Sequence, residues 1–322
     1  MAIAEYLVYH EANPRKALEL GAECTTHAEF KDWWWKLTLG KCYYKLGVFR
    51  EAERQLKSSL AEQDMVVTHL ELCKVYLRLD QPNTALEHLT KASQTHPGEP
   101  RLVLSIARIH DMLNTPEIAV TYYKRVLALD ASNVESVACL AANHFYSDQP
   151  EISLRYYRRL LQMGVNNTEM WNNLGLCCFY SSQYDISLSC FERALELADD
   201  GNMADVWYNV GQVAVGIGDV SLAYQAFKIA TSVDSAHAES FNCIGVLELR
   251  KQNVEAAQAN FATAQKLAPY LFEPFYNSAL LAYKMGNFQD AFLQVSSALG
   301  VYPGHSDSLE LKRTLSSIFS VL

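Results

Sequence analysis

A pair of residues, usually a branched aliphatic followed by a small side chain, recurs along the chain at a nearly constant interval. Successive pairs are separated by 33, 34, 34, 34, 36, 34 and 34 residues. This period predicts a stack of helix pairs that presents an extended surface, not a globule built around one pocket. The pairs are Leu39-Gly40, Leu72-Cys73, Ile106-Ala107, Leu140-Ala141, Leu174-Gly175, Val210-Gly211, Ile244-Gly245 and Ser278-Ala279.

The spacing inside each interval resembles the tetratricopeptide repeat. In that family a bulky residue precedes the pair, and a small residue, an aromatic and an alanine follow it. Small residues where two helices cross allow close approach of the backbones, and large ones fill the space between helix pairs. One copy has Trp171, Leu174, Gly175, Phe191 and Ala194, and later copies repeat it with Trp207, Val210, Gly211, Ala223, Phe227 and Ala230, and with Phe241, Ile244, Gly245, Ala257, Phe261, Ala264 and Pro269.

Turn residues fall at one phase of the repeat. Pro82, Pro116 and Pro150 share a position where each is expected to open a second helix, since a first-turn proline loses no hydrogen bond. We predict an all-α, right-handed superhelical solenoid with a partial repeat at 1–32, eight repeats at 33–305 and a capping helix at 306–322. The repeats are expected to start near Trp33, Val66, Pro100, Val134, Thr168, Ala204, Ala238 and Phe272, with two extra residues in a loop at 199–202.

Composition narrows the classes of partner. The net charge of −9 disfavours nucleic acid as the main partner. No apolar run reaches the length of a membrane span and no signal peptide is visible, so we expect a soluble intracellular chain. Met1 stands almost directly before the apolar run from Ile3 to Tyr9, which suggests that an N-terminal segment is missing.

No motif for catalysis or cofactor binding is found, and every segment is used by a repeat. We therefore expect no enzyme activity, no cofactor and no metal. The eight cysteines, without any C-x-x-C, are interpreted as free thiols that fill the core, with a metal site as the minor alternative. His110 and His144 occupy one repeat position; they are expected to replace core tyrosines, and a shared metal or a pH-sensitive contact is the alternative.

The first helices of stacked repeats should face a concave groove, and its residues are the candidate binding site. Basic residues come early, aromatic residues in the middle and asparagines late, while an acidic residue recurs at the second repeat position (Glu135, Glu169, Asp205, Glu239 and Glu273). The candidates are Lys41, Lys45, Lys74, Arg78, Arg108, Phe145, Tyr146, Asn172, Asn173, Leu176, Phe179, Tyr180, Tyr208, Asn209, Asn242, Tyr276, Asn277 and Tyr283. Within Trp33-Trp34-Trp35, Trp34 is the candidate interface anchor, although all three indoles could be buried.

These residue types suggest how an extended peptide could be held. Carboxamides both donate and accept hydrogen bonds, so a row of asparagines can bind a peptide backbone whatever its sequence. A basic row would favour acidic residues and the aromatics would bury apolar ones. The alternative is that the charges are a solvated face and the aromatics are core. A carboxylate clamp of the co-chaperone type is disfavoured, because no repeat has lysine at the fifth position.

Several stretches go beyond the repeat consensus. They are DWWWK at 32–36, GKCYY at 40–44, NHFYSDQPE at 143–151, YYRRLLQMG at 156–164, NNLGLCCFY at 172–180 and ADVWYN at 204–209. They resemble the Bardet–Biedl syndrome protein eight family, tetratricopeptide subunits of the BBSome, over essentially the whole chain. That family is longer at its N-terminus.

The resemblance implies a non-catalytic scaffold or adaptor in a coat-like complex that moves membrane proteins to and from cilia. The implied partners are a second tetratricopeptide subunit, β-propeller subunits and a small extended subunit that threads the groove, with membrane contact only through the complex. The implied location is the cytoplasm, cilium, basal body and centriolar region. Two alternatives stay open: a scaffold of another assembly such as a ubiquitin ligase, and a regulatory repeat arm of an enzyme such as a glycosyltransferase.

Overall fold

A computed structural model describes residues 1–321 of the chain. These residues form nineteen α-helices and contain no β-strand, so the predicted all-α class is confirmed. The chain divides into two compact units, Met1–Gly164 and Val165–Leu322, and each is described by itself.

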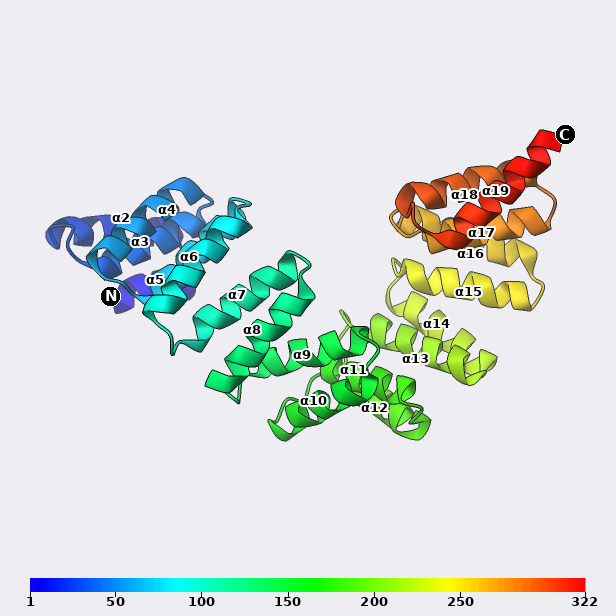
Figure 1. Cartoon of the computed structure of the whole chain (residues 1–322), viewed down its shortest axis with the longest axis horizontal. Coiled ribbons are helices and arrows are strands. Elements are labelled where there is room, and N and C mark those ends of the chain that lie inside the picture. Colours follow the sequence, from blue (N-terminus) through cyan, green and yellow to red (C-terminus); the bar gives the residue numbers. More distant parts are fainter. Residues whose placement is uncertain (322) are drawn as a thin grey trace. The chain divides into compact units, whose positions relative to one another are not determined.

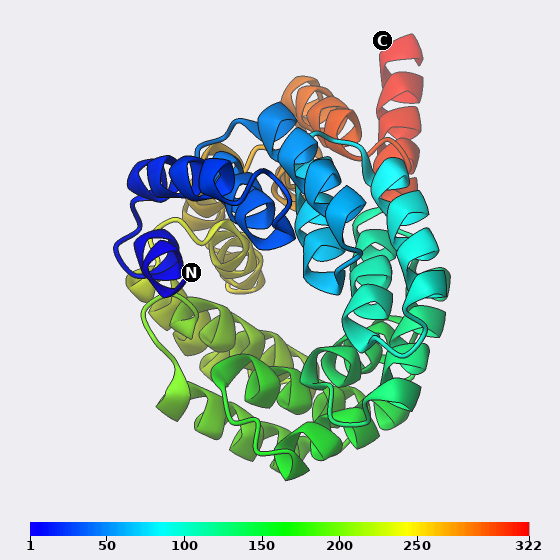
Figure 2. The same ribbon diagram turned by 90° about the vertical axis from the view of Figure 1, so that its left-hand side faces the viewer.

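The first unit contains ten helices that pack as successive pairs, so that each second helix also contacts the first helix of the next pair (Figure 1). Figure 2 shows the same stacking within this unit, from blue to green. The helices are α1 (Ala2–Tyr9), α2 (Pro14–His27), α3 (Trp33–Lys45), α4 (Phe49–Glu62), α5 (Val66–Arg78), α6 (Pro82–Thr95), α7 (Pro100–Met112), α8 (Pro116–Leu129), α9 (Val134–Tyr146) and α10 (Pro150–Gln162).

The second unit repeats this organisation. Its first and second helices again contact each other within a pair and between pairs. The helices are α11 (Thr168–Tyr180), α12 (Tyr184–Leu197), α13 (Met203–Ile217), α14 (Val220–Val233), α15 (Ala238–Arg250), α16 (Val254–Leu267), α17 (Glu273–Lys284), α18 (Phe288–Val301) and α19 (Ser306–Val321). The expected loop at 199–202 lies between α12 and α13.

One backbone turn closes each first helix from α3 to α17. A residue with positive φ follows the helix, and the next amide N–H bonds the carbonyl five residues earlier, as in Gln81 to Tyr76 and Asn253 to Glu248. This is the Schellman geometry, which satisfies the last carbonyls of a helix. The prolines predicted to open α6, α8 and α10 do so. The positive-φ residues are Gly47, Asp80, Asn114, Asp148, Ser182, Gly218, Gln252 and Gly286.

Close packing inside a pair depends on a glycine and a bulky residue sixteen positions later. Phe191, Phe227 and Phe261 are almost completely buried. A Cβ atom added at Gly211 would lie 2.5 Å from the Phe227 ring, and one at Gly245 would lie 2.6 Å from the Phe261 ring. Each ring therefore occupies the space that a side chain on the first helix would need.

The last helix packs on the end of the second unit. Leu311 and Leu315 are buried against α17 and α18, and Phe319 lies edge-on to Phe292 with ring centroids 5.8 Å apart. Leu309 and Phe319 are 37% and 43% exposed, so α19 covers the second unit mainly through Leu311 and Leu315. Leu322 lies outside the described residues. No described helix combines the length and apolar character needed to cross a bilayer.

The glycine–phenylalanine contact predicts a large effect of added volume on stability. Replacing Gly211 with Val should lower the free energy of unfolding by about 2 kcal/mol or more, because the added atoms collide with a fully buried ring. Chemical denaturation of the full chain, followed by circular dichroism, measures this change.

Gly98→Val is the matched control, since a Cβ there meets nothing within 4 Å and the residue lies between helices. It should shift stability by less than about 0.5 kcal/mol. Equal effects of the two substitutions would contradict the packing argument.

Candidate binding surfaces

The first helices of neighbouring pairs contact one another directly, as do α3 and α5, α5 and α7, α11 and α13, and α15 and α17. All the predicted groove residues lie on first helices, namely α3, α5, α7, α9, α11, α13, α15 and α17. Each unit thus has a face formed by its first helices, which we call the first-helix face.

The predicted asparagines meet in pairs across neighbouring first helices of the second unit. The Asn209 amide on α13 donates to the Asn172 carbonyl oxygen on α11 at 2.9 Å, and Asn277 on α17 donates to Asn242 on α15 at the same distance. Asn173 also accepts a longer bond, 3.3 Å, from Asn172. All five are half-buried. Each bonded pair uses one donor and one acceptor, so further donors and acceptors stay available for a peptide backbone.

Two lysines of the predicted basic row are engaged by the N-terminal helix. The Lys45 ammonium donates to the Val8 carbonyl oxygen and lies 4.8 Å from the centre of the Tyr9 ring. Lys41 lies 5.7 Å from the same ring. The helix α1 therefore covers this part of the first-helix face, which the sequence pattern did not indicate.

The other three cations also have partners within the chain. Lys74 pairs with Glu71 at 2.9 Å, and Arg78 donates to the Tyr44 hydroxyl at 3.2 Å. Arg108 on α7 binds Glu135 on α9 through two parallel hydrogen bonds. Glu135, one of the acidic residues at the second repeat position, therefore neutralises Arg108 of the predicted basic row.

Two hollows lie on the first-helix face. In the first unit a cavity of about 400 Å³ between α5 and α7 has Leu70 and Leu104 in its lining, with Lys74 and Arg108 among its charged residues. In the second unit a cavity of about 690 Å³ is lined mainly by residues of α15 and α17, with Gln252 from the turn after α15 and Val254 from the start of α16. It includes Asn277, Leu280 and Lys284. The apolar linings of both hollows were not among the sequence candidates, because their leucines fit a core pattern equally well.

The central aromatic residues differ in exposure. Tyr146 and Tyr180 end α9 and α11 and are 86% and 62% exposed, and each lies edge-on to the preceding phenylalanine. Phe179 is half-buried, and its ring lies so close to Gly216 of α13 that a Cβ there would collide with it. Leu176 packs with it against the core. Phe145 is half-buried on α9.

The remaining aromatic candidates are largely packing residues. Tyr208 lies against His237 and Phe227, and burial raises the pKa of its hydroxyl. Tyr276 lies edge-on to His305 with centroids 4.9 Å apart, and Tyr283 packs beside Phe288. Trp34 is half-buried and stands edge-on to Trp35 at 4.8 Å.

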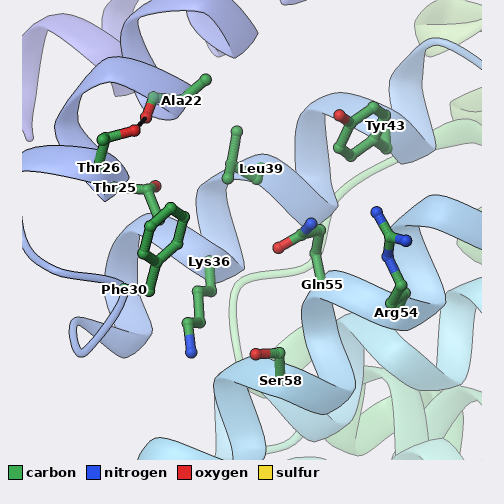
Figure 3. A pocket seen from close by; sticks show the side chains of 10 residues that line it. All are labelled: Ala22, Thr25, Thr26, Phe30, Lys36, Leu39, Tyr43, Arg54, Gln55 and Ser58. Carbon is green, nitrogen blue, oxygen red and sulfur yellow. Dashed lines mark hydrogen bonds between the residues drawn. The ribbon is translucent and has the colours of Figure 1, made fainter.

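A third cavity, of about 510 Å³, lies between α2, α3 and α4 of the first unit. Figure 3 shows Phe30, Leu39 and Tyr43 around it, together with polar side chains from both sides. The hydroxyls of Thr25 and Thr26 donate to carbonyls of their own helix. The Lys36 ammonium, almost completely buried, pairs with Glu62 at 2.8 Å. The polar groups of Thr25, Thr26 and Lys36 are thus bonded inside the chain.

His110 and His144 have closely similar surroundings. Each ring stacks on a tyrosine of its own pair, Tyr122 or Tyr156, with centroids 5.5 Å apart. Nδ1 of His110 bonds the Thr115 hydroxyl, and Nδ1 of His144 bonds the Gln149 side chain. Both are half-buried packing residues bonded inside their own repeat, as expected from the sequence.

All eight cysteines are free thiols, and five are buried. Burial raises the pKa of Cys42 and of Cys73 to about 11, although nearby cations oppose the shift. A thiol with a raised pKa is a poor nucleophile and a poor metal ligand at neutral pH. The arrangement supports the core-filling interpretation.

Comparison with known proteins identifies the repeat. A sequence model of the tetratricopeptide repeat matches residues 168–200. Tetratricopeptide repeat protein 8 of Mus musculus is 49% identical over 322 residues, which is 100% of this chain and 62% of that protein. The Homo sapiens protein of that name is 50% identical over 309 residues, 96% of this chain and 57% of that one. The Caenorhabditis elegans protein is 36% identical, over 80% of this chain and 51% of that one.

Solved structures support the same fold. A tetratricopeptide repeat protein from Parabacteroides merdae matches with a TM-score of 0.66 and 14% identity, over 77% of this chain and 97% of that one. The APC/C hetero-tetramer Cut9-Hcn1 matches with a TM-score of 0.59 and 12% identity, over 97% of this chain and 62% of that one. The fold is therefore a tetratricopeptide-repeat solenoid, a fold built for protein interaction. The chain spans between 51% and 62% of the length of the curated relatives.

The buried thiols predict selective chemical modification. With iodoacetamide at pH 8, Cys42 and Cys73 of the folded chain should react at least about 100-fold more slowly than in the unfolded chain, since a pKa near 11 leaves about 0.1% thiolate and burial limits access. Mass spectrometry of tryptic peptides measures the rates. Cys24, which is half-buried, is the internal reference; equal rates at all three sites would contradict the assignment.

Proposed function

We propose that the chain is a non-catalytic scaffold or adaptor subunit of the BBSome, the coat-like complex that traffics membrane proteins to and from cilia. The observation that carries the proposal is the 49% identity to tetratricopeptide repeat protein 8 along the full 322 residues. Identity at this level is far above the 12–14% that the repeat fold alone gives in the structural matches. It extends the resemblance of the quoted stretches to the rest of the chain.

The mechanism is multivalent docking. The first-helix face would hold a small extended subunit, while other faces and the ends of the array would contact the second tetratricopeptide subunit and β-propeller subunits. Paired asparagines in the second unit leave amide groups for a peptide backbone. The hollow between α5 and α7 is lined by apolar residues together with Lys74 and Arg108. This lining would suit a partner segment in which an apolar side chain is flanked by acidic ones.

The chain's own ion pairs modify the acidic-peptide hypothesis. An incoming carboxylate at Lys74 or Arg108 has to compete with Glu71 or Glu135, so such contacts would contribute more to selectivity than to affinity. At Lys41 and Lys45 it would also have to compete with α1. A test of peptide binding is therefore better directed at the α5–α7 hollow than at Lys41 and Lys45.

Affinity purification of the chain from ciliated cells tests the assembly. After a salt wash, mass spectrometry should identify the second tetratricopeptide subunit and β-propeller subunits of one complex. Fluorescence microscopy of the labelled chain should place it at the cilium and basal body. Recovery of chaperones alone, or of an unrelated ubiquitin ligase, would overturn the proposal.

Charge reversal in the α5–α7 hollow tests the groove. Lys74→Glu with Arg108→Glu should reduce retention of the extended subunit by roughly 10-fold, because two cations become anions beside Glu71 and Glu135. Quantitative mass spectrometry of the purified complex gives the ratio of this subunit to the propeller subunits.

The matched control is Lys91→Glu with Arg125→Glu, two exposed cations on the second helices α6 and α8. It changes the net charge by the same amount and should leave retention unchanged. If both double variants behave alike while circular dichroism reports an intact fold, the hollow does not hold the partner.

A further inference from the structure

Three histidines and an aspartate converge at the junction of α4, α5 and α6. Asp64 lies in the loop before α5, His69 is in the first turn of α5, His88 is in the middle of α6 and His96 caps the end of α6. No known metal-binding spacing links these positions in sequence, and we expected no metal from the sequence alone. The helix pairing brings them together.

The ligand atoms of Asp64, His69 and His96 lie close together. Nε2 of His69 lies 2.5 Å from Oδ1 of Asp64, and Nε2 of His96 lies 3.3 Å from Oδ2 of the same carboxylate. The atoms that these residues can offer to a metal all lie within 4.8 Å of one another. Ligand atoms on a tetrahedral zinc ion are about 3.3 Å apart, given bonds of about 2 Å. Small side-chain rotations would bring the set to that spacing.

The Nε2 atom of His96 lacks a hydrogen-bond partner, which is a second observation in favour of a bound ion. Its Nε2 atom is buried, and it makes no hydrogen bond of good geometry despite its closeness to Asp64. A buried nitrogen without such a bond costs free energy unless an unseen water or ion satisfies it. In the tautomer of His96 that carries its proton on Nδ1, the Nε2 lone pair is available to a cation.

His88 stands behind His69 and fixes its orientation. Nε2 of His88 lies 2.8 Å from Nδ1 of His69, with ring centroids 4.8 Å apart. In the tautomer of His88 that carries its proton on Nδ1, Nε2 accepts the Nδ1 proton of His69. That bond leaves Nε2 of His69 as the metal-facing atom, the usual arrangement of a ligating histidine.

We propose that Asp64, His69 and His96 bind one zinc ion, with His88 as the hydrogen-bond acceptor that orients His69. Two imidazole nitrogens and one carboxylate oxygen form a ligand set that zinc prefers, with water in the fourth position. The Asp64 side chain is 49% exposed, so an ion can enter from solvent. Bound zinc would tie the loop before α5 to both helices of the pair, α5 and α6.

Zinc titration of the tag-free full chain, after removal of metals with a chelator, tests the site against a chromophoric competitor. The chain should bind one equivalent of zinc through this set. Asp64→Asn and His96→Ala should each weaken binding at least about 100-fold, and His88→Leu, which removes only the acceptor, should weaken it about 10- to 100-fold. His110→Ala, a half-buried histidine outside the set, should bind as the unchanged chain does.

Cobalt substitution separates this site from the cysteines. A histidine–carboxylate set gives the visible bands of four-coordinate cobalt without the sulfur-to-metal charge-transfer band that thiolate ligation adds. His69 is buried, so the less buried Asp64 and His96 carry the test, with circular dichroism confirming that each variant folds. Thiolate bands, or zinc binding that Asp64→Asn and His96→Ala leave unchanged, would overturn the proposal.

Discussion

The close contact between a glycine on one helix and a bulky side chain on its partner constrains the rest of this structure. At Gly175, Gly211 and Gly245 the ring of a phenylalanine sixteen residues later fills the space of a missing side chain. At Gly40 the partner is Leu56. Because this contact sets the distance between the two helices of a pair, it also directs their remaining side chains outward, toward neighbouring pairs and the first-helix face. The surface available for binding is thus a consequence of how tightly each pair is packed.

Regular packing explains why so much of the fold could be predicted from the sequence. A first helix must end where its partner can turn back, so the positive-φ residues recur at the same interval as the aliphatic–small pairs, from Gly47 to Gly286. Proline is tolerated just after this turn, which located α6, α8 and α10. Leu309 shows the limit of the approach: its apolar character fits the cap, but only the direction of α19 decides that Leu311 and Leu315 face the core instead.

The sequence predicted which helices carry the candidate residues, but not all the contacts that these residues make within the chain. The asparagines were expected in a row, and Asn172 with Asn209 and Asn242 with Asn277 do meet across neighbouring helices. The pairing of Arg108 with Glu135 depends on how far two long side chains reach between helices, which a periodic pattern does not encode. The engagement of Lys45 by Val8 depends on where α1 folds back. The cations that the sequence pattern suggested were free for a partner are therefore already partly engaged by groups of the chain itself.

The histidine cluster was missed for a related reason. Asp64 and His96 lie outside the helices, in the connections whose course the repeat period does not specify, and they meet His69 only because α5 is packed between α4 and α6. His110 and His144 do share a repeat position, but the Nδ1 atom of each ring is bonded inside its own pair. In a solenoid, a site that only one repeat carries is expected where the residues of that repeat differ from those of its neighbours. The α4–α6 junction, with four polar groups replacing ordinary packing, is such a place.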